Sequence, residues 1–129
     1  MQELFVKYAV PVGISIVTFF APVHIIMSVV GGLLVFDFIT GIWASLKRGE
    51  SISSRRMSRT VGKAVLYQLA IISAFLLEVG IGGVIPVAKL VAGVIALTEG
   101  KSLVENLNTI SGTNLFKVVL DKITYQQKP

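Results

Sequence analysis

The chain has 129 residues, enough for one domain, but its composition is unusual for a soluble protein. Apolar residues make up 53% and charged residues only 15%, with a mean hydropathy of +0.80, whereas a soluble domain of this size needs many charged side chains to cover its surface. The absence of cysteine excludes disulfides and thiol chemistry, and a single histidine excludes a multi-histidine metal site. We therefore expect an all-α integral membrane protein that carries no cofactor.

The first apolar segment, residues 4–21, is the weakest candidate for a membrane span. It is short, since about 20 apolar residues are needed to cross a bilayer. A helix lying in the membrane interface is the alternative. A signal peptide is a further alternative, but no small-residue cleavage site in polar surroundings follows. Because the apolar run continues beyond Pro22, we predict that the segment is retained.

A second span is predicted over residues 25–46, after a turn between Pro22 and Ser28, because proline disfavours continued helix before it. This span contains Asp37, the one acidic residue of the apolar run. An Asp at the helix centre costs roughly 3 kcal/mol, while each Leu, Ile, Val or Phe returns about 0.3–0.6 kcal/mol. Twelve such residues leave insertion favourable by about 2 kcal/mol, so the helix can carry the carboxylate.

Small side chains share the helix face of Asp37. They follow it at three, four, seven and eight positions, namely Thr40, Gly41, Ala44 and Ser45. Small residues let helices approach closely in lipid, and a membrane-embedded acid points toward a protein contact or a wet cavity. Two interpretations stay open: a pore or packing surface between protomers, and a structural hydrogen bond within one protomer.

A basic segment, residues 47–63, follows this span and holds six of the twelve Lys and Arg residues of the chain. These are Lys47, Arg48, Arg55, Arg56, Arg59 and Lys63. Set against Glu50 alone, they place the segment on the cytoplasmic side by the positive-inside rule, and its Ser and Gly residues predict a flexible loop. No aromatic residues interleave the bases, so we do not expect nucleic-acid binding.

Residues 64–85 form the third predicted span, with Glu78 as its one charged residue. A second stripe of small residues with one acid runs along it at a spacing of four: Ala70, Ala74, Glu78 and Gly82. Lys89 lies just beyond the Gly82–Pro86 break, so we expect it to fold back and pair with Glu78 near the outer interface.

The fourth predicted helix covers residues 87–110, although its strongly apolar part is too short to span by itself. Glu99, Ser102 and Asn106 share one of its faces by their three- and four-residue spacing. The chain is thus expected to form a single membrane domain over residues 1–129 with three to four transmembrane helices, four being favoured.

A short amphipathic helix is predicted at the C-terminus, residues 114–125, with an apolar stripe that suits a membrane surface or a partner. Gly112 is a suitable stop for the preceding helix, and Asn114 a suitable N-cap for this one. No catalytic set, glycine-rich phosphate loop or metal-ligand spacing emerges from the sequence, so we do not expect an enzyme.

Two stretches of the sequence together resemble a known family. FDFITGIWASLKRGESISS resembles the D-x-x-T-G element of the bacteriophage holin family that includes the clostridial toxin-secretion holins. TEGKSLVENLNTISG resembles the second element of that family, whose polar residues are here Glu99, Ser102, Glu105, Asn106 and Gly112. The resemblance covers roughly residues 28–124.

The resemblance implies a multi-pass phage protein of the bacterial inner membrane that associates with copies of itself and with lipid. Such holins cluster at a set time and open lesions, so that a cytoplasmic endolysin reaches the cell wall without needing direct contact with the holin. The residues alone leave two alternatives open: a small oligomeric channel or transporter, in which intramembrane acids relay protons, and a membrane-anchored scaffold protein.

Overall fold

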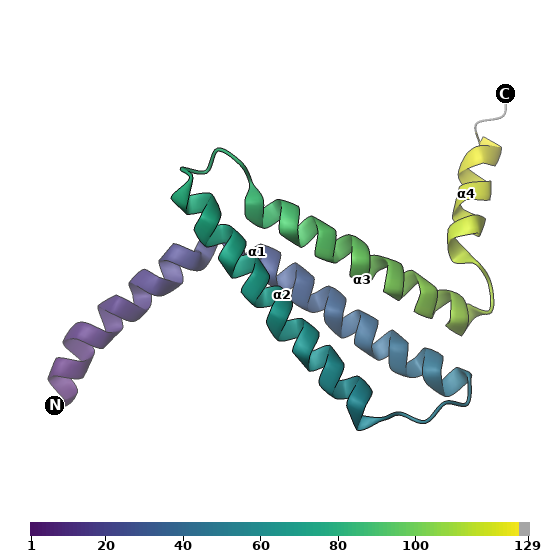
Figure 1. Cartoon of the computed structure of the whole chain (residues 1–129), viewed down its shortest axis with the longest axis horizontal. Coiled ribbons are helices and arrows are strands. Elements are labelled where there is room, and N and C mark those ends of the chain that lie inside the picture. The colour runs from purple at the N-terminus through teal and green to yellow at the C-terminus, as the bar shows by residue number, and fades with distance from the viewer. Residues whose placement is uncertain (127–129) are drawn as a thin grey trace.

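The computed structural model describes residues 1–126 and is all-helical over that range, as the composition predicts (Figure 1). Its helices are α1 (Gln2–Lys47), α2 (Ser54–Gly80), α3 (Val87–Ser111) and α4 (Leu115–Gln126). Two of them, α1 and α2, are long and apolar enough to cross a membrane. The prediction of a helical membrane protein thus agrees with the architecture.

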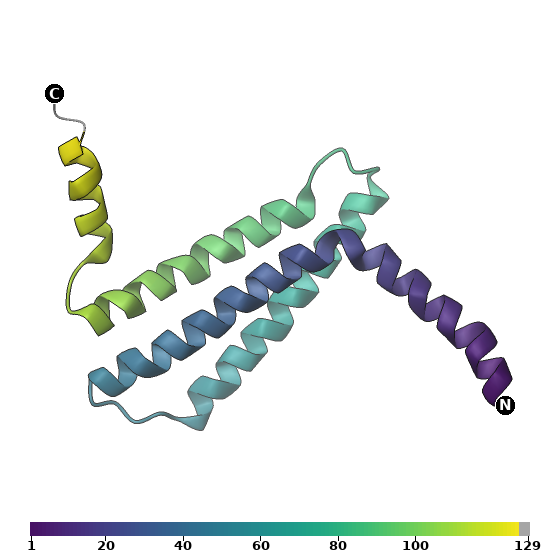
Figure 2. The same ribbon diagram turned by 180° about the vertical axis from the view of Figure 1, so that it is seen from behind.

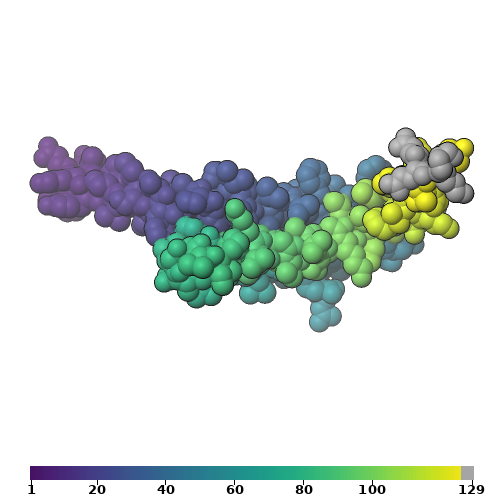
Figure 3. All heavy atoms as spheres, turned by 90° about the horizontal axis from the view of Figure 1, so that it is seen from above, coloured from purple at the N-terminus to yellow at the C-terminus, as the bar shows by residue number. Residues whose placement is uncertain are grey.

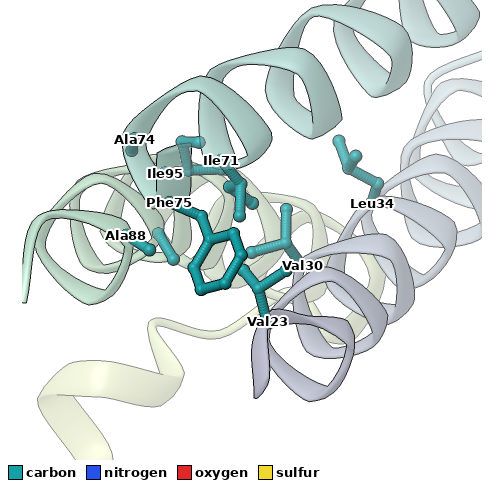
Figure 4. Packing of buried hydrophobic residues seen from close by; sticks show 9 residues of the cluster. Val23, Val30, Leu34, Ile71, Ala74, Phe75, Ala88 and Ile95 are labelled. Carbon is teal, nitrogen blue, oxygen red and sulfur yellow. The ribbon is translucent and has the colours of Figure 1, made fainter. Parts of the chain in front are cut away.

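The C-terminal part of α1 lies beside α2 and α3 in a three-helix bundle (Figures 1 and 2). Buried side chains from all three helices form its core (Figure 4): Val23, Val30 and Leu34 from α1, Ile71, Ala74 and Phe75 from α2, and Ala88, Ala92 and Ile95 from α3. Three of the nine are alanines, and small side chains at helix contacts let the backbones approach closely.

Helix α1 is continuous through Pro22, so the predicted turn at 22–28 and the two separate helices 4–21 and 25–46 are wrong. Proline lacks an N–H and its ring crowds the carbonyl four residues earlier, which bends a helix when strong helical sequence continues on both sides. Figures 1 and 2 show the N-terminal part of α1 leaving the bundle at an angle. Phe19 and Phe20 pack against Phe75 near this departure, with ring centroids 5.6 and 5.9 Å away.

The part of α1 that leaves the bundle, residues 2–18, is here named the N-terminal arm. Nearly all of its side chains are exposed, including Phe5, Ile14 and Val17. Figure 3 shows the arm projecting from one end of the molecule, with α4 at the other end. A helix that is apolar on all sides and has no protein neighbour is suited to contact lipid or another membrane protein.

The basic segment is mostly helical, so the flexible loop predicted over 47–63 is wrong. Only residues 48–53 connect α1 to α2, which begins at Ser54 and carries Arg55, Arg56, Arg59 and Lys63 on its first turns. Long basic side chains are good helix formers, and they reach the water while their helix continues into an apolar region. The third predicted span, 64–85, is accordingly displaced: α2 starts earlier and ends at Gly80.

Glycines with positive φ follow the ends of α2 and α3. Gly82, predicted to lie on the small-residue stripe of α2, instead lies in the turn after that helix with φ +74°, in the left-handed region that favours glycine. Gly112 ends α3 with φ +71°, as predicted. The prediction that Asn114 caps the last helix is confirmed, because its Oδ1 accepts a hydrogen bond from the Lys117 N–H at 3.1 Å.

Replacing Ala92 by Leu is expected to destabilise the bundle, because the side chain is 7% exposed between tightly packed helices. Overpacking of this kind costs about 1–3 kcal/mol. The free energy of unfolding can be measured by circular dichroism during denaturation in detergent micelles. Val94→Leu, at a position 66% exposed on the same helix, is the control. Equal stability of the two variants would contradict the close approach of α3.

Candidate functional site: a polar layer inside the bundle

Asp37 meets Asn106 across the contact between α1 and α3. The Asn106 Nδ2 donates a hydrogen bond to Asp37 Oδ1 at 3.0 Å and also lies 3.4 Å from Thr40 Oγ1. A Cβ added to Gly41 would lie 3.5 Å from the same nitrogen, so the glycine brings the α1 backbone close to α3. The two sequence elements that resemble holins therefore bond to each other within one protomer.

Ala44 and Ser45, near the C-terminal end of α1, are fully buried. The Ser45 hydroxyl accepts hydrogen bonds from the guanidinium groups of Arg48 and Arg56. Both arginines also bond to Glu50, and the hydrogen bond from Arg48 lowers the pKa of Glu50 to about 2. The small-residue face of Asp37 thus packs inside the protomer and ends in a network of charged groups.

Glu99 on α3 is the most deeply buried charged residue of the described chain, with 1% of its surface exposed. Its two carboxylate oxygens lie 2.8 and 2.9 Å from Lys63 Nζ on α2. The Tyr67 hydroxyl donates to it as well, at 2.9 Å. A buried carboxylate is tolerated when it is paired and hydrogen-bonded, and here α2 supplies both partners.

Glu99 and Asn106 are two helical turns apart, so one face of α3 bonds α2 at one level and α1 at another. Ser102 lies half-buried between them, as the predicted shared face requires. Glu105 lies elsewhere on the helix: it is exposed and faces Lys101 at 3.8 Å. We name the interhelical set the polar layer, which consists of Asp37, Thr40, Lys63, Tyr67, Glu99 and Asn106.

Sequence reasoning selected Asp37, Glu99 and Asn106 but named no partner for any of them, and it did not select Tyr67. The available signal was the spacing of Glu99 and Asn106, which places both on one helix face. Two polar residues on one face of a helix in a membrane protein require partners on neighbouring helices. Which neighbouring residues become these partners depends on how the helices pack against one another. The sequence around Glu99 and Asn106 does not specify that packing.

Glu78 does not pair with Lys89 as predicted. Its Oε2 instead accepts a hydrogen bond from the Ala88 N–H at 3.0 Å, because the first N–H groups of a helix have no partner within that helix. The predicted stripe of small residues through Glu78 does not form one buried surface, because Ala74 is buried whereas Ala70 is exposed. Each step of four residues turns about 40° around a helix, so a stripe with this spacing drifts off a straight contact.

The polar layer is built to hold helices together. Across residues 1–126 the structure contains no group of three or more His, Cys, Asp or Glu side chains placed to hold a metal ion. Each member instead contacts a neighbouring helix through the hydrogen bonds given above. The layer therefore joins the three helices of one protomer.

A sequence profile of the bacteriophage holin family matches residues 14–125, which include the whole bundle and nearly all of α4. The chain belongs to the bacteriophage holin family. The resemblance predicted from the two sequence elements is confirmed. Holins are a family of membrane-permeabilising proteins without a known enzymatic activity. Neither a comparison with curated proteins nor one with solved structures finds a match.

Replacing Asn106 by Leu is expected to weaken the contact between α1 and α3, because the Asp37 carboxylate loses its donor. Hydrogen bonds between membrane helices contribute about 0.6 kcal/mol on average and up to about 1.7 kcal/mol. The swapped pair, Asp37→Asn with Asn106→Asp, keeps one amide and one carboxylate and is expected to recover most of the loss. Unfolding in detergent measures both variants, and a swap no more stable than Asn106→Leu would contradict a direct bond.

Proposed function

We propose that this holin accumulates in the bacterial inner membrane as closed protomers, then oligomerises and forms lesions that release a cytoplasmic endolysin. Family membership supports a holin role in general. The observation that carries the finer proposal is the Asp37–Asn106 bond, which satisfies membrane-embedded polar groups inside one protomer. A protein closed in this way can accumulate without opening the membrane.

The bundle is proposed to cross the membrane three times, by the C-terminal part of α1, by α2 and by α3. Each is about 25 residues long, which corresponds to about 38 Å and suits a bilayer with its interfaces. The basic cluster formed by Lys47, Arg48, Arg55, Arg56, Arg59 and Lys63 lies at one end of the bundle and is assigned to the cytoplasm. The N-terminal arm then begins at the outer face, instead of forming the fourth span favoured from sequence.

Lysis would follow a change of partners. In the closed protomer the polar layer bonds across helices of one chain, while many large apolar side chains are exposed on the outer surface. When protomers cluster, helix contacts between copies replace contacts with lipid, and polar side chains released from the layer can line water. In the closed protomer the polar side chains bond to one another, whereas in the clustered form they face water. The clustered form is therefore the one that permeabilises the membrane.

Co-expression with an endolysin tests this function. The chain is expressed from an inducible promoter in bacteria, with and without an endolysin that lacks an export signal, and culture turbidity is followed. We expect abrupt lysis only when both are present, since the lesion must pass a folded protein. Growth arrest with slow leakage would favour a small channel or transporter, and an unaffected culture would favour a scaffold. Either result would contradict the proposal.

Asp37→Asn is expected to delay lysis in the same assay, because the neutral amide gains less from water in the clustered state than a carboxylate does. Membrane levels of the protein, measured by immunoblot, correct for differences in insertion. Glu78→Gln is the matched control: it removes one acid but keeps an oxygen that can accept from the Ala88 N–H. If Asp37→Asn lysed on the wild-type schedule at equal abundance, a role for this carboxylate in opening would be wrong.

A further inference from the structure

The Lys63–Glu99 ion pair is unequally exposed. The side chain of Glu99 is 1% exposed, whereas that of Lys63 is 41% exposed. Lys63 lies on the first turns of α2, among the basic residues assigned to the cytoplasmic end, so its ammonium group has access to water. Glu99 lies inside the bundle and exchanges its partner for water only if α3 moves away from α2.

The two members of the pair therefore respond differently to the loss of the other. If Glu99 is made neutral, Lys63 remains hydrated through its exposed side, and the interior no longer holds a charge. If Lys63 is made neutral, the carboxylate stays buried, with the Tyr67 hydroxyl at 2.9 Å as its remaining side-chain donor. An uncompensated buried charge is strongly destabilising, whereas a neutral replacement of a buried pair is often tolerated.

We propose that the Lys63–Glu99 pair is a latch that sets the time of lysis: it keeps α3 closed on α2, and its release lets water reach the Glu99 carboxylate. This proposal rests on the lytic function above and names the contact that controls it. Glu99 favours the open state, since it gains hydration there. Lys63 favours the closed state, since it compensates the charge inside the bundle.

The latch predicts shifts of opposite sign for two variants that break the same bond. In co-expression with the endolysin, Lys63→Met is expected to lyse cells earlier than wild type. Glu99→Gln is expected to lyse them later, and the double variant is expected to lose the early lysis of Lys63→Met. Lys101→Met is the matched control, because it removes the same charge from an exposed pair, in which Lys101 and Glu105 lie 3.8 Å apart. Its lysis time is expected to equal that of wild type.

Shifts of the same sign for Lys63→Met and Glu99→Gln would overturn the latch, since they would mean that the pair contributes only stability. Unchanged timing in both would also overturn it. These results differ from failure of the lytic function itself, in which wild type would not lyse cells with the endolysin. Membrane abundance is measured for every variant. If Lys63→Met does not accumulate, the delay in Glu99→Gln and the following measurement decide.

Water access to position 99 can be measured directly, because the chain has no cysteine of its own. In a Glu99→Cys variant, a small maleimide that requires a hydrated thiolate should not label the membrane-inserted protein before lysis and should label it afterwards. Thr98→Cys, at an exposed neighbouring position, shows the labelling of a site outside the bundle core. Labelling of position 99 before lysis, or none after it, would overturn the proposed movement of α3.

Discussion

A polar side chain inside a membrane must find its partner within the protein, and in the proposed topology α3 depends on this constraint. Its length equals that of a span, yet it is not among the helices that are apolar enough to cross a membrane by composition, and Glu99 and Asn106 are two of its polar residues. Both are satisfied once α1 and α2 lie beside it, through Asp37 and Lys63. The bundle is thus more than a packed core, because two of its helices provide the environment that the third one needs.

The same constraint explains where small residues occur. Gly41 brings α1 close enough to α3 for the Asn106 amide to reach the Asp37 carboxylate. The small side chain of Ala92 lets α3 pack closely within the apolar core. In lipid the hydrophobic effect gives no net attraction between helices, so close packing and hydrogen bonds must supply it. The short side chains let the helices approach closely, and the polar side chains beside them can then reach their hydrogen-bond partners.

Local patterns in the sequence predicted the helical class, the family, the cap at Asn114 and the shared face of Glu99 and Asn106. They wrongly predicted a turn at Pro22, where helix-forming sequence on both sides outweighs one missing hydrogen bond. They also wrongly predicted a loop at Lys63, because the charged residues around it were taken as a sign of a loop. Pairings such as Lys63 with Glu99 join residues far apart in the chain. They depend on the rotation and depth of each helix, which follow from packing of the whole bundle.

In the proposed topology, the proline within α1 has a consequence for how deep the bundle lies in the bilayer. Pro22 has no N–H for the carbonyl oxygen of Thr18, so this oxygen needs a donor from outside the helix. Hydrocarbon has none, whereas the headgroup region has water. The bend is therefore most stable at the level of the lipid headgroups, and it acts as a depth marker. A thicker or thinner membrane would tilt the bundle before it buried this carbonyl.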